Sequence, residues 1–247
     1  MRYLIVSDIH ANWEALAAVL EQASGEYDRI VCLGDLVGYG PDPNPVVEWV
    51  KANCAVVVRG NHDRAASGIE SLEWFNPVAR TAAIWTQQEL TADHADYVRA
   101  LPPGPMPFDS FQISHGSPLE EDGYVVTSRD AMYLFPYLER DLTFFGHTHL
   151  QGGFVWAQEK VQNLGTPQVE DGQLAALELR ADHCFLLNPG AVGQPRDGDP
   201  RAAYAIYVTE EKCVYYARVE YDVGSVQKKI RAAGLPDSLA DRLAVGR

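Results

Sequence analysis

Short apolar runs separated by helical segments are the feature that most restricts the fold of this chain. In the first sixty residues the runs occupy positions 3–7, 30–33 and 55–58, and their length and β-rich composition predict strands. The segments between them have the apolar spacing and the start signals of helices. Because strands that alternate with helices pair in parallel, this part of the chain predicts a partly parallel sheet.

The two intervening helices are expected at residues 13–23 and 43–52. Asn12 stands in the N-cap position of the first, and prolines at 43 and 45 open the second. A longer helical block is expected over residues 77–101, divided near Thr91.

The second half of the chain reads as strands, with a helix expected to begin near Ser128 and a helical tail after Gly224. The strands are expected at 111–114, 142–145, 154–157, 174–179, 184–187, 203–209 and 213–221. The last five follow one another with turn signals between them, which predicts a second, largely antiparallel sheet. Two sheets that bury one face each against the other, with helices outside, make the predicted fold a four-layer αββα sandwich of the α/β class, as one domain over residues 1–247.

Composition excludes several classes of protein. No apolar run approaches the ~20 residues that cross a bilayer, and the N-terminal stretch does not have the form of a secretory signal, so we expect a cytoplasmic protein without a membrane partner. The 34 acidic and 20 basic residues give a net charge of −14, which repels a polyanion and disfavours dedicated binding of nucleic acid. The four cysteines lie singly, without C-x-x-C spacing, which indicates reduced thiols.

Five of the seven histidines directly follow apolar, strand-like runs. They are His10, His62, His115, His147 and His149. Ligands of open α/β sheets bind beyond the carboxyl ends of the strands, so these side chains are expected to converge. His94 and His183 lack this context and are expected to be structural.

Two of the motifs pair an acidic residue with the end of a strand. Asp8 and His10 are two residues apart, which places an oxygen and an imidazole on the same side of an extended strand end, where they can hold one divalent ion. Asp35 follows the second strand, and its two oxygens suit a carboxylate that bridges two metals. Taken singly, each has a structural alternative: Asp8 as a helix cap and Asp35 as part of an ordinary turn.

The remaining motifs are richer in histidine. Residues 60–63 read G-N-H-D and place an amide oxygen beside an imidazole, a pair that few structural turns need. His115 precedes a glycine and could alone be a hydrogen-bonded structural residue. Residues 146–149 read G-H-T-H and put two histidines on one face behind an apolar strand, which costs stability unless something coordinates them.

In this order the motifs D-x-H, G-D, G-N-H-D, H-G and G-H-T-H, over residues 8–149, resemble the calcineurin-like metallophosphoesterase superfamily. The resemblance implies the αββα sandwich and a site for two divalent metal ions. The first metal would be held by Asp8, His10 and His149, the second by Asn61, His115 and His147, with Asp35 as the bridge between them. Mixed nitrogen and oxygen ligands of this kind accept manganese, iron, zinc, cobalt or nickel.

A Gly/Pro-rich segment at 188–201 extends the resemblance toward a bacterial branch related to diadenosine tetraphosphatases and serine/threonine phosphatases. In those enzymes the bridging motif continues G-D-x-V-x-R-G, usually with an aspartate before the arginine in protein phosphatases. Here Gly38 and Tyr39 occupy those two positions, so close functional identity does not follow.

Arg196 is the candidate for a replacement phosphate clamp, because it lies in a rigid loop after a strand and its guanidinium can bind phosphate through two hydrogen bonds. The alternative is an ion pair with Asp197 or Asp199 that stabilises the turn. Tyr39 and Asn12 flank the site and are candidate substrate contacts.

The resemblance therefore implies a phosphoester hydrolase. A hydroxide shared by two ions roughly 3.5–4 Å apart would attack a small phosphomonoester, phosphodiester or dinucleoside polyphosphate. His62 would protonate the leaving group, since the charge of a histidine changes near pH 7. The alternatives are a non-catalytic metal-binding scaffold of the same fold and a serine/threonine-type protein phosphatase.

Overall fold

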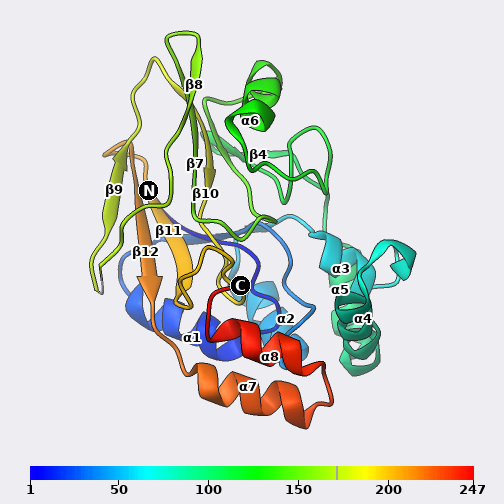
Figure 1. Cartoon of the computed structure of the whole chain (residues 1–247). Helices are drawn as coiled ribbons and strands as arrows, with labels where there is room; N and C mark the ends of the chain where they lie inside the picture. The colour runs from blue at the N-terminus through cyan, green and yellow to red at the C-terminus, as the bar shows by residue number, and fades with distance from the viewer. Residues whose placement is uncertain (171) are drawn as a thin grey trace.

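Two six-stranded sheets pack face to face in the computed structural model, which describes residues 1–170 and 172–247 (Figure 1). The first sheet has the order β3 (Val56–Val57), β2 (Arg29–Cys32), β1 (Arg2–Val6), β11 (Ala202–Val208), β12 (Cys213–Val219) and β9 (Ala175–Glu178). The second has the order β4 (Met106–Phe108), β5 (Phe111–Ile113), β6 (Leu142–Phe144), β10 (Cys184–Asn188), β7 (Gly152–Ala157) and β8 (Lys160–Asn163).

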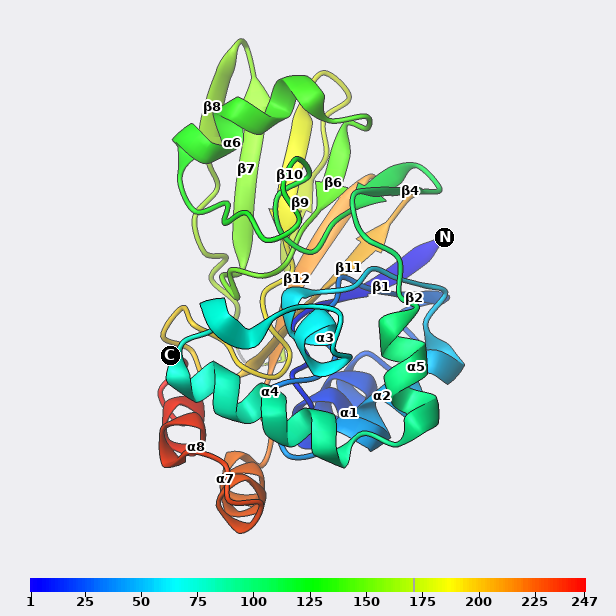
Figure 2. The same cartoon turned by 90° about the vertical axis from the view of Figure 1, so that its right-hand side faces the viewer.

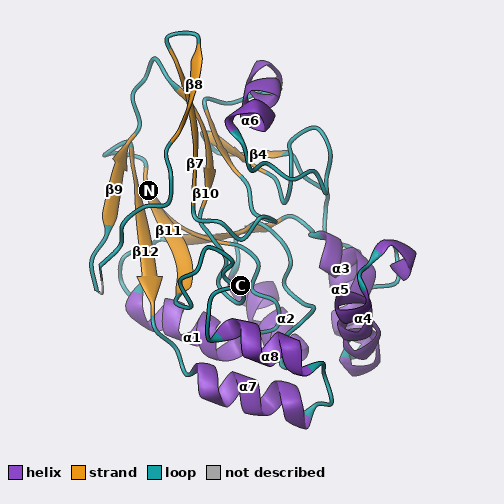
Figure 3. Ribbon diagram, in the orientation of Figure 1, coloured by secondary structure: helices purple, strands orange, loops and turns teal. Residues whose placement is uncertain are grey.

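Helices lie outside both sheets. They are α1 (Trp13–Gln22), α2 (Pro43–Asn53), α3 (Asn61–Ala66), α4 (Pro77–Glu89), α5 (Ala92–Arg99), α6 (Ser128–Leu134), α7 (Val223–Ala232) and α8 (Asp237–Leu243), with short 3-10 turns at Leu72–Trp74 and Phe135–Tyr137. Figure 3 shows α1, α2, α7 and α8 on one side of the sandwich and α6 on the other. The predicted αββα architecture is confirmed.

The alternation of side chains along β1 explains the layers. Leu4 and Val6 pack against the helices beside the first sheet, whereas Tyr3 and Ile5 lie in the core between the two sheets. Because both faces of β1 are buried, its sequence is an unbroken apolar run rather than an alternating one.

The helix predictions agree with the structure. Asn12 caps α1 by accepting a hydrogen bond from the backbone N–H of Ala15 at 3.1 Å. Thr91 caps α5 and separates it from α4, where the division of the block was expected. Figure 2 shows α4 and α5 beside α3, and both contact that helix.

The prediction that the late strands form a second sheet of their own is wrong. β9, β11 and β12 extend the sheet that β1 begins, whereas β7, β8 and β10 join the strands of residues 106–144. β11 runs antiparallel to β1, with Ile206 opposite Leu4. Turn signals report which strands are adjacent in sequence, and they carry no information on which distant strand completes the other edge of β1.

The described residues contain no helix that is long and apolar enough to cross a membrane. All four cysteines are free thiols; Cys32 and Cys213 are buried, and Cys54 and Cys184 are partly exposed.

The loop between β10 and β11 is tied to the first sheet by a buried ion pair. Arg218 on β12 is 1% exposed and pairs with Asp197, with one guanidinium nitrogen 3.1 Å from Oδ1 of that carboxylate. Its Nε donates to Oε1 of Gln151 at 3.1 Å. The pair holds the segment that carries Arg196 against the end of the sandwich.

We expect Arg218→Gln to lower the free energy of unfolding by about 3–5 kcal/mol, because Asp197 would remain buried without its cation. Urea denaturation measures the change. The control is Arg140→Gln, an exposed arginine that donates to the backbone carbonyl of Glu139, and it should change stability by less than about 0.5 kcal/mol. Equal stability of the two variants would show that the pair contributes nothing.

Candidate metal centre

The predicted metal ligands lie just beyond the carboxyl ends of five strands. Asp8 and His10 follow β1, Asp35 follows β2, Asn61 follows β3 at the start of α3, His115 follows β5, and His147 and His149 follow β6. β1, β2 and β3 are parallel to one another, and so are β5 and β6. Their loops therefore meet at one end of the sandwich, as expected.

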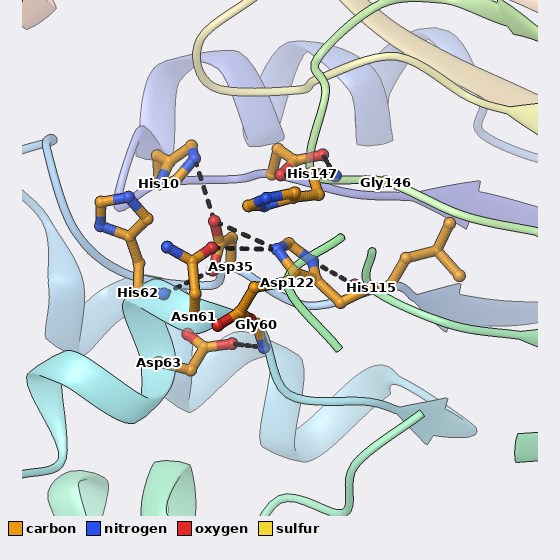
Figure 4. A network of polar contacts seen from close by, with 12 residues as sticks. His10, Asp35, Gly60, Asn61, His62, Asp63, His115, Asp122, Gly146 and His147 are labelled. Atoms are coloured by element: carbon orange, nitrogen blue, oxygen red, sulfur yellow. Dashed lines mark hydrogen bonds and ion pairs between the residues drawn. The ribbon is translucent and has the colours of Figure 1, made fainter. Parts of the chain in front are cut away.

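Two groups of ligand atoms form there, each within 4.8 Å, and they share Asp35. The first contains Asp8, His10, Asp35 and His149, and the second contains Asp35, His115 and His147. Figure 4 shows Asp35 between His10 on one side and His115 on the other, with His147 nearby. Oδ2 of Asp35 lies 3.5 Å from Nε2 of His10 and 3.4 Å from Nε2 of His115.

The other ligand atoms are equally close. Nε2 of His149 lies 3.1 Å from Nε2 of His10 and 3.3 Å from Oδ1 of Asp8. Oδ1 of Asn61 lies 3.3 Å from Nε2 of His115, which brings the predicted amide ligand to the second group. All of these contacts point nitrogen and oxygen atoms at common centres.

Backbone carbonyls fix the orientation of three of the rings. Nδ1 of His10 is 3.1 Å from the carbonyl oxygen of Val37, and Nδ1 of His115 is 2.8 Å from that of Leu33. Nδ1 of His149 is 2.6 Å from the carbonyl oxygen of Gln194. A proton on Nδ1 leaves the lone pair on Nε2, so each of these rings presents the nitrogen that a metal ion would bind.

Five of the seven predicted ligand residues share an unusual backbone conformation. Their φ angles are positive: 53° for Asp8, 48° for His10, 52° for Asp35, 64° for His147 and 59° for His149. Left-handed backbone is uncommon for residues other than glycine, and it persists where the surrounding structure enforces it.

Buried carboxylates enforce these turns. Asp63 accepts hydrogen bonds from the backbone N–H groups of Gly60 and Leu36, both at 2.9 Å, and so joins the turn before α3 to the turn that carries Asp35. Asp8 accepts from the backbone N–H of His147 at 3.1 Å. The turns of different strands therefore hold one another in place.

Gly146 permits the close approach that its motif suggested. A Cβ atom at this position would lie 2.0 Å from Oγ of Ser7 and 2.9 Å from Oδ2 of Asp8. Any larger residue would push the strand of His147 away from the strand of Asp8.

The protonation states favour metal binding. Burial lowers the pKa of His10 and His149 well below 6.5 and that of His147 to about 3, so these rings are neutral near pH 7. Burial disfavours the charge on Asp35, but His115, His62 and His10 together outweigh it and hold the pKa of Asp35 well below its usual range. His115 differs, because the Asp35 carboxylate outweighs the effect of burial and raises the pKa of His115 to about 10, so a metal ion would have to displace the proton on its Nε2. The other three imidazoles are neutral and the carboxylate of Asp35 is ionised, as a divalent cation requires.

A buried nitrogen without a hydrogen-bond partner indicates that a cation fits this site. Nε2 of His147 is buried and has no hydrogen-bond partner among the described residues, which costs about 1–3 kcal/mol unless something binds it. Burial also raises the pKa of Asp8 to about 7, and a neighbouring cation would favour its ionised form. The residues present therefore fit divalent metal ions in both groups.

His62 lies beside these groups and belongs to neither. Its ring centroid is 5.0 Å from that of His10 and 4.3 Å from that of Tyr39. Its buried Nδ1 has no partner in the described part of the chain. A Cβ atom on Gly38 would lie 2.7 Å from this nitrogen, so a residue with a side chain fits at position 38 only if His62 moves.

The structure does not show the ion pair considered for Arg196. Asp197 pairs with Arg218, and Asp199 pairs with Arg201. The guanidinium of Arg196 instead lies over the ring of Tyr39, 5.9 Å from its centroid.

The structure also gives the hydrogen-bond partners of Asn12 and of the two histidines that were expected to be structural. Both ends of the Asn12 side chain are used internally, because Oδ1 caps α1 and Nδ2 donates to the carbonyl oxygen of Gly193 at 2.9 Å. Its contact with substrate stays a prediction. His94 hydrogen-bonds Asn44 and His183 pairs with Asp182, so neither joins the metal centre.

A cleft of about 240 Å³ opens over the second group of ligands. It is lined by Tyr39, Asn61, His62, Glu70, Phe75, Asn76, Ala79, Asp122, Tyr124 and His147. The ring of Tyr124 lies 4.2 Å from that of His147, centroid to centroid, and Phe75 meets His62 at 5.4 Å. A larger hollow of about 540 Å³ is lined by residues outside the metal-ligand groups.

Sequence reasoning missed the lining residues on the connecting segments. Glu70 and Asp122 both pair with Arg64 of α3, which offsets one of their two charges at the mouth of the cleft. Phe75 and Tyr124 lie in segments without strand periodicity, so no local pattern marks them as part of a site.

Residues 1–212 match the family model of the calcineurin-like phosphoesterase superfamily domain, and the chain belongs to this family. Its resemblance to that superfamily is thereby confirmed.

Two similar proteins cover nearly the whole chain, and a third matches a short part of it. An uncharacterised protein of Methanocaldococcus jannaschii is 36% identical over 98% of this chain and 97% of its own length. The crystal structure of a metallophosphoesterase from Sphaerobacter thermophilus has 42% identity and a TM-score of 0.86, covering 100% of this chain and 99% of the other. A symmetrical bis(5'-nucleosyl)-tetraphosphatase of Erwinia tasmaniensis is 39% identical over 67 residues, which are 26% of this chain and 24% of that protein.

We expect Asp35→Asn to lower metal content and hydrolytic activity together, because it removes the one charge that both groups share. Metal analysis by mass spectrometry after dialysis measures the stoichiometry. Asp122→Asn is the control, since it makes the same change at the cleft outside both groups. Full metal content with normal turnover in Asp35→Asn would refute the shared role of Asp35.

Proposed function

We propose that this protein is a phosphoester hydrolase that uses two divalent metal ions, held by Asp8, His10 and His149 on one side and by Asn61, His115 and His147 on the other, with Asp35 between them. The observation that carries the proposal is the two groups of buried carboxylate and imidazole side chains that share Asp35, with its Oδ2 about equally far from His10 and His115. When bound, the ions would activate a water molecule and offset the charge that develops on the phosphoryl oxygens.

The alternative of a non-catalytic scaffold is less well supported. A scaffold has no need of a neutral, buried histidine such as His147, whose Nε2 has no partner among the described residues, because such an atom costs folding stability. The similar structure from Sphaerobacter thermophilus is described as a metallophosphoesterase, which agrees with hydrolysis.

His62 is the residue proposed to act on the leaving group. It lines the cleft next to Asn61, at the N-terminus of α3. Burial lowers the pKa of His62 to about 4, so its ring is neutral near pH 7, unlike the ordinary histidine that the sequence led us to expect. Protonation of the leaving oxygen therefore requires a bound phosphate dianion, whose charge raises the pKa of the neighbouring imidazole.

Arg196 is proposed to hold phosphoryl oxygens from the Tyr39 side of the site. Its Nε is buried and has no partner in the described structure, and its charge acts on both His10 and His149. A guanidinium that is free of carboxylates and close to the ligands is suited to bind an anion there.

The substrate is proposed to be a small phosphomonoester, phosphodiester or dinucleoside polyphosphate. A serine/threonine-type protein phosphatase is less well supported, because Gly38 and Tyr39 occupy the positions of both residues that complete that motif. In addition, Nδ1 of His62 has no hydrogen-bond partner among the described residues. The short similarity to a bis(5'-nucleosyl)-tetraphosphatase favours the inclusion of dinucleoside polyphosphates among the compounds to test.

A metal and substrate panel tests the proposal. Metal-stripped protein is reloaded with manganese, iron, zinc, cobalt or nickel and assayed with p-nitrophenyl phosphate, its diester, and a dinucleoside tetraphosphate. We expect metal-dependent turnover of at least one compound. Absence of turnover with every metal would leave a metal-binding scaffold as the better description.

We expect His62→Asn to retain its metals and to lower turnover by ~10²–10⁴-fold on alkyl phosphoesters, the usual effect of losing a positioned acid. The loss should be smaller on p-nitrophenyl esters, because nitrophenolate leaves without a proton. His94→Asn is the matched control on a surface histidine that bonds Asn44. Equal losses on both ester classes would assign His62 to charge stabilisation instead.

We expect Arg196→Lys to raise the KM for phosphoesters and to weaken inhibition by inorganic phosphate, while metal content stays normal, because lysine lacks the planar fork of donors. Steady-state kinetics with Arg140→Lys as a control measure the effect. An unchanged KM together with unchanged phosphate inhibition would remove Arg196 from the substrate site.

A further inference from the structure

The C-terminal helix α8 lies outside the span of the family model and reaches the edge of the metal centre. Leu239 and Leu243 of α8 pack in an apolar cluster that also contains Tyr39. The backbone N–H of Gly198 donates to the carbonyl oxygen of Gly246 at 3.0 Å, which joins the end of the chain to the loop that carries Arg196. Figures 1 and 2 both show the C-terminus beside this loop.

This docking brings a second arginine to Arg196. One guanidinium nitrogen of Arg242, on α8, donates to Oε1 of Gln194 at 3.2 Å. One guanidinium nitrogen of Arg196 donates to the same oxygen, also at 3.2 Å. Two cations therefore share a single neutral acceptor.

Neither guanidinium has an ion-pair partner among the residues whose side chains the structure describes. Asp241, next to Arg242 in sequence, pairs with Arg231 of α7. The carboxylates beside Arg196 pair with Arg218 and Arg201, as described above. In a chain with 34 acidic and 20 basic residues, two adjacent cations without an acid are a distinct feature.

The proximity of the Arg196 and Arg242 guanidinium groups is electrostatically unfavourable without a bound anion. Burial and the charge of Arg196 lower the pKa of Arg242, and Nε of Arg196 is buried without a partner. Two close like charges repel, and a bound anion would both offset that repulsion and accept the unused donors. The arrangement is that of an anion site built from two elements.

The order of the groups places this site relative to the metals. Nδ1 of His149 lies 2.6 Å from the carbonyl oxygen of Gln194, whose side chain accepts from both Arg196 and Arg242. Arg196 also lies over the ring of Tyr39, whose centroid is 4.8 Å from that of His10. The two arginines are therefore close to the first group of ligands. An anion held by Arg242 would lie next to a phosphoryl group at the metal centre.

We propose that Arg242, together with Arg196, binds a second phosphoryl group of the substrate, so that the preferred substrates are phosphoanhydrides. This inference rests on the proposed function. In the reaction, water adds to the phosphorus at the metal centre and releases one proton to the solvent, the bridging P–O bond breaks, and the departing phosphate keeps the bridging oxygen and its electron pair. Arg242 and Arg196 stabilise the charge that forms on this departing phosphate.

Calorimetric binding of phosphonates tests the subsite without turnover, because P–C bonds resist hydrolysis. The full-length, manganese-loaded protein is titrated with methylphosphonate, which has one anionic group, and with methylenediphosphonate, which has two. Free manganese is held at a fixed excess, so that chelation by the ligand is the same for every variant.

We expect Arg242→Gln to weaken methylenediphosphonate binding by ~10-fold or more, the effect of losing a charged hydrogen-bonding partner, and to change methylphosphonate binding by less than about twofold. Arg242→Lys should weaken the diphosphonate to an intermediate extent, since it keeps the charge and loses the fork. Arg231→Gln is the control, an equal charge change on α7 at an arginine that already has acidic partners.

If Arg242→Gln weakens the binding of both phosphonates equally, Arg242 contacts the reacting phosphoryl group. If it weakens neither, Arg242 only supports Gln194. Either result overturns the proposal. Thermal melting checks the fold, and the lysine variant replaces the glutamine variant if the latter unfolds. Failure of the proposed function has a separate signature, namely no turnover by the wild-type protein with any metal, whatever the phosphonate titrations show.

Discussion

The buried carboxylate of Asp35 is the constraint around which the rest of the structure is arranged. A side chain that is 1% exposed can keep its charge only if neighbouring groups stabilise it, and Asp35 has His10 and His115 beside Oδ2 and the backbone N–H of His62 at 2.9 Å from Oδ1. These groups come from three different loops, so the strands must end at one level. The parallel pairing of β1 with β2 and of β5 with β6 provides that alignment.

The surroundings of this centre are electrically asymmetric. On the cleft side, the carboxylates of Glu70 and Asp122 share the single cation of Arg64, so these three groups leave one negative charge at the mouth of the cleft. On the Tyr39 side, Arg196 and Arg242 share a neutral acceptor and have no acid among the described side chains. The carboxylates of the centre suit metal cations, and the arginine pair suits an anion. A ligand with phosphate groups would therefore contact the metal ions at one end and the arginines at the other.

Local pattern was a good guide to most helices and strands and to the ligand set, and a poor guide to longer-range structure. Asn12 and Thr91 act as the expected helix caps because capping depends on residues within one turn. The assignment of β9, β11 and β12 to a separate sheet failed because strand partners far apart in sequence are chosen by burial of both faces of β1. The lowered pKa of His62 likewise follows from its burial in the assembled site, which no sequence pattern reports.

By itself, the sequence determined which side chains meet at the centre, because residues that directly follow strands are placed by strand direction, and Asp8, Asp35 and His115 all lie there. Only the tertiary structure decided what surrounds them. Arg242 is about two hundred residues away from Tyr39 along the chain and reaches Gln194 because α8 buries its apolar face in the cluster that contains Tyr39. Contacts of this kind depend on packing between distant segments, and hydrophobic burial specifies that packing without leaving a motif in either segment.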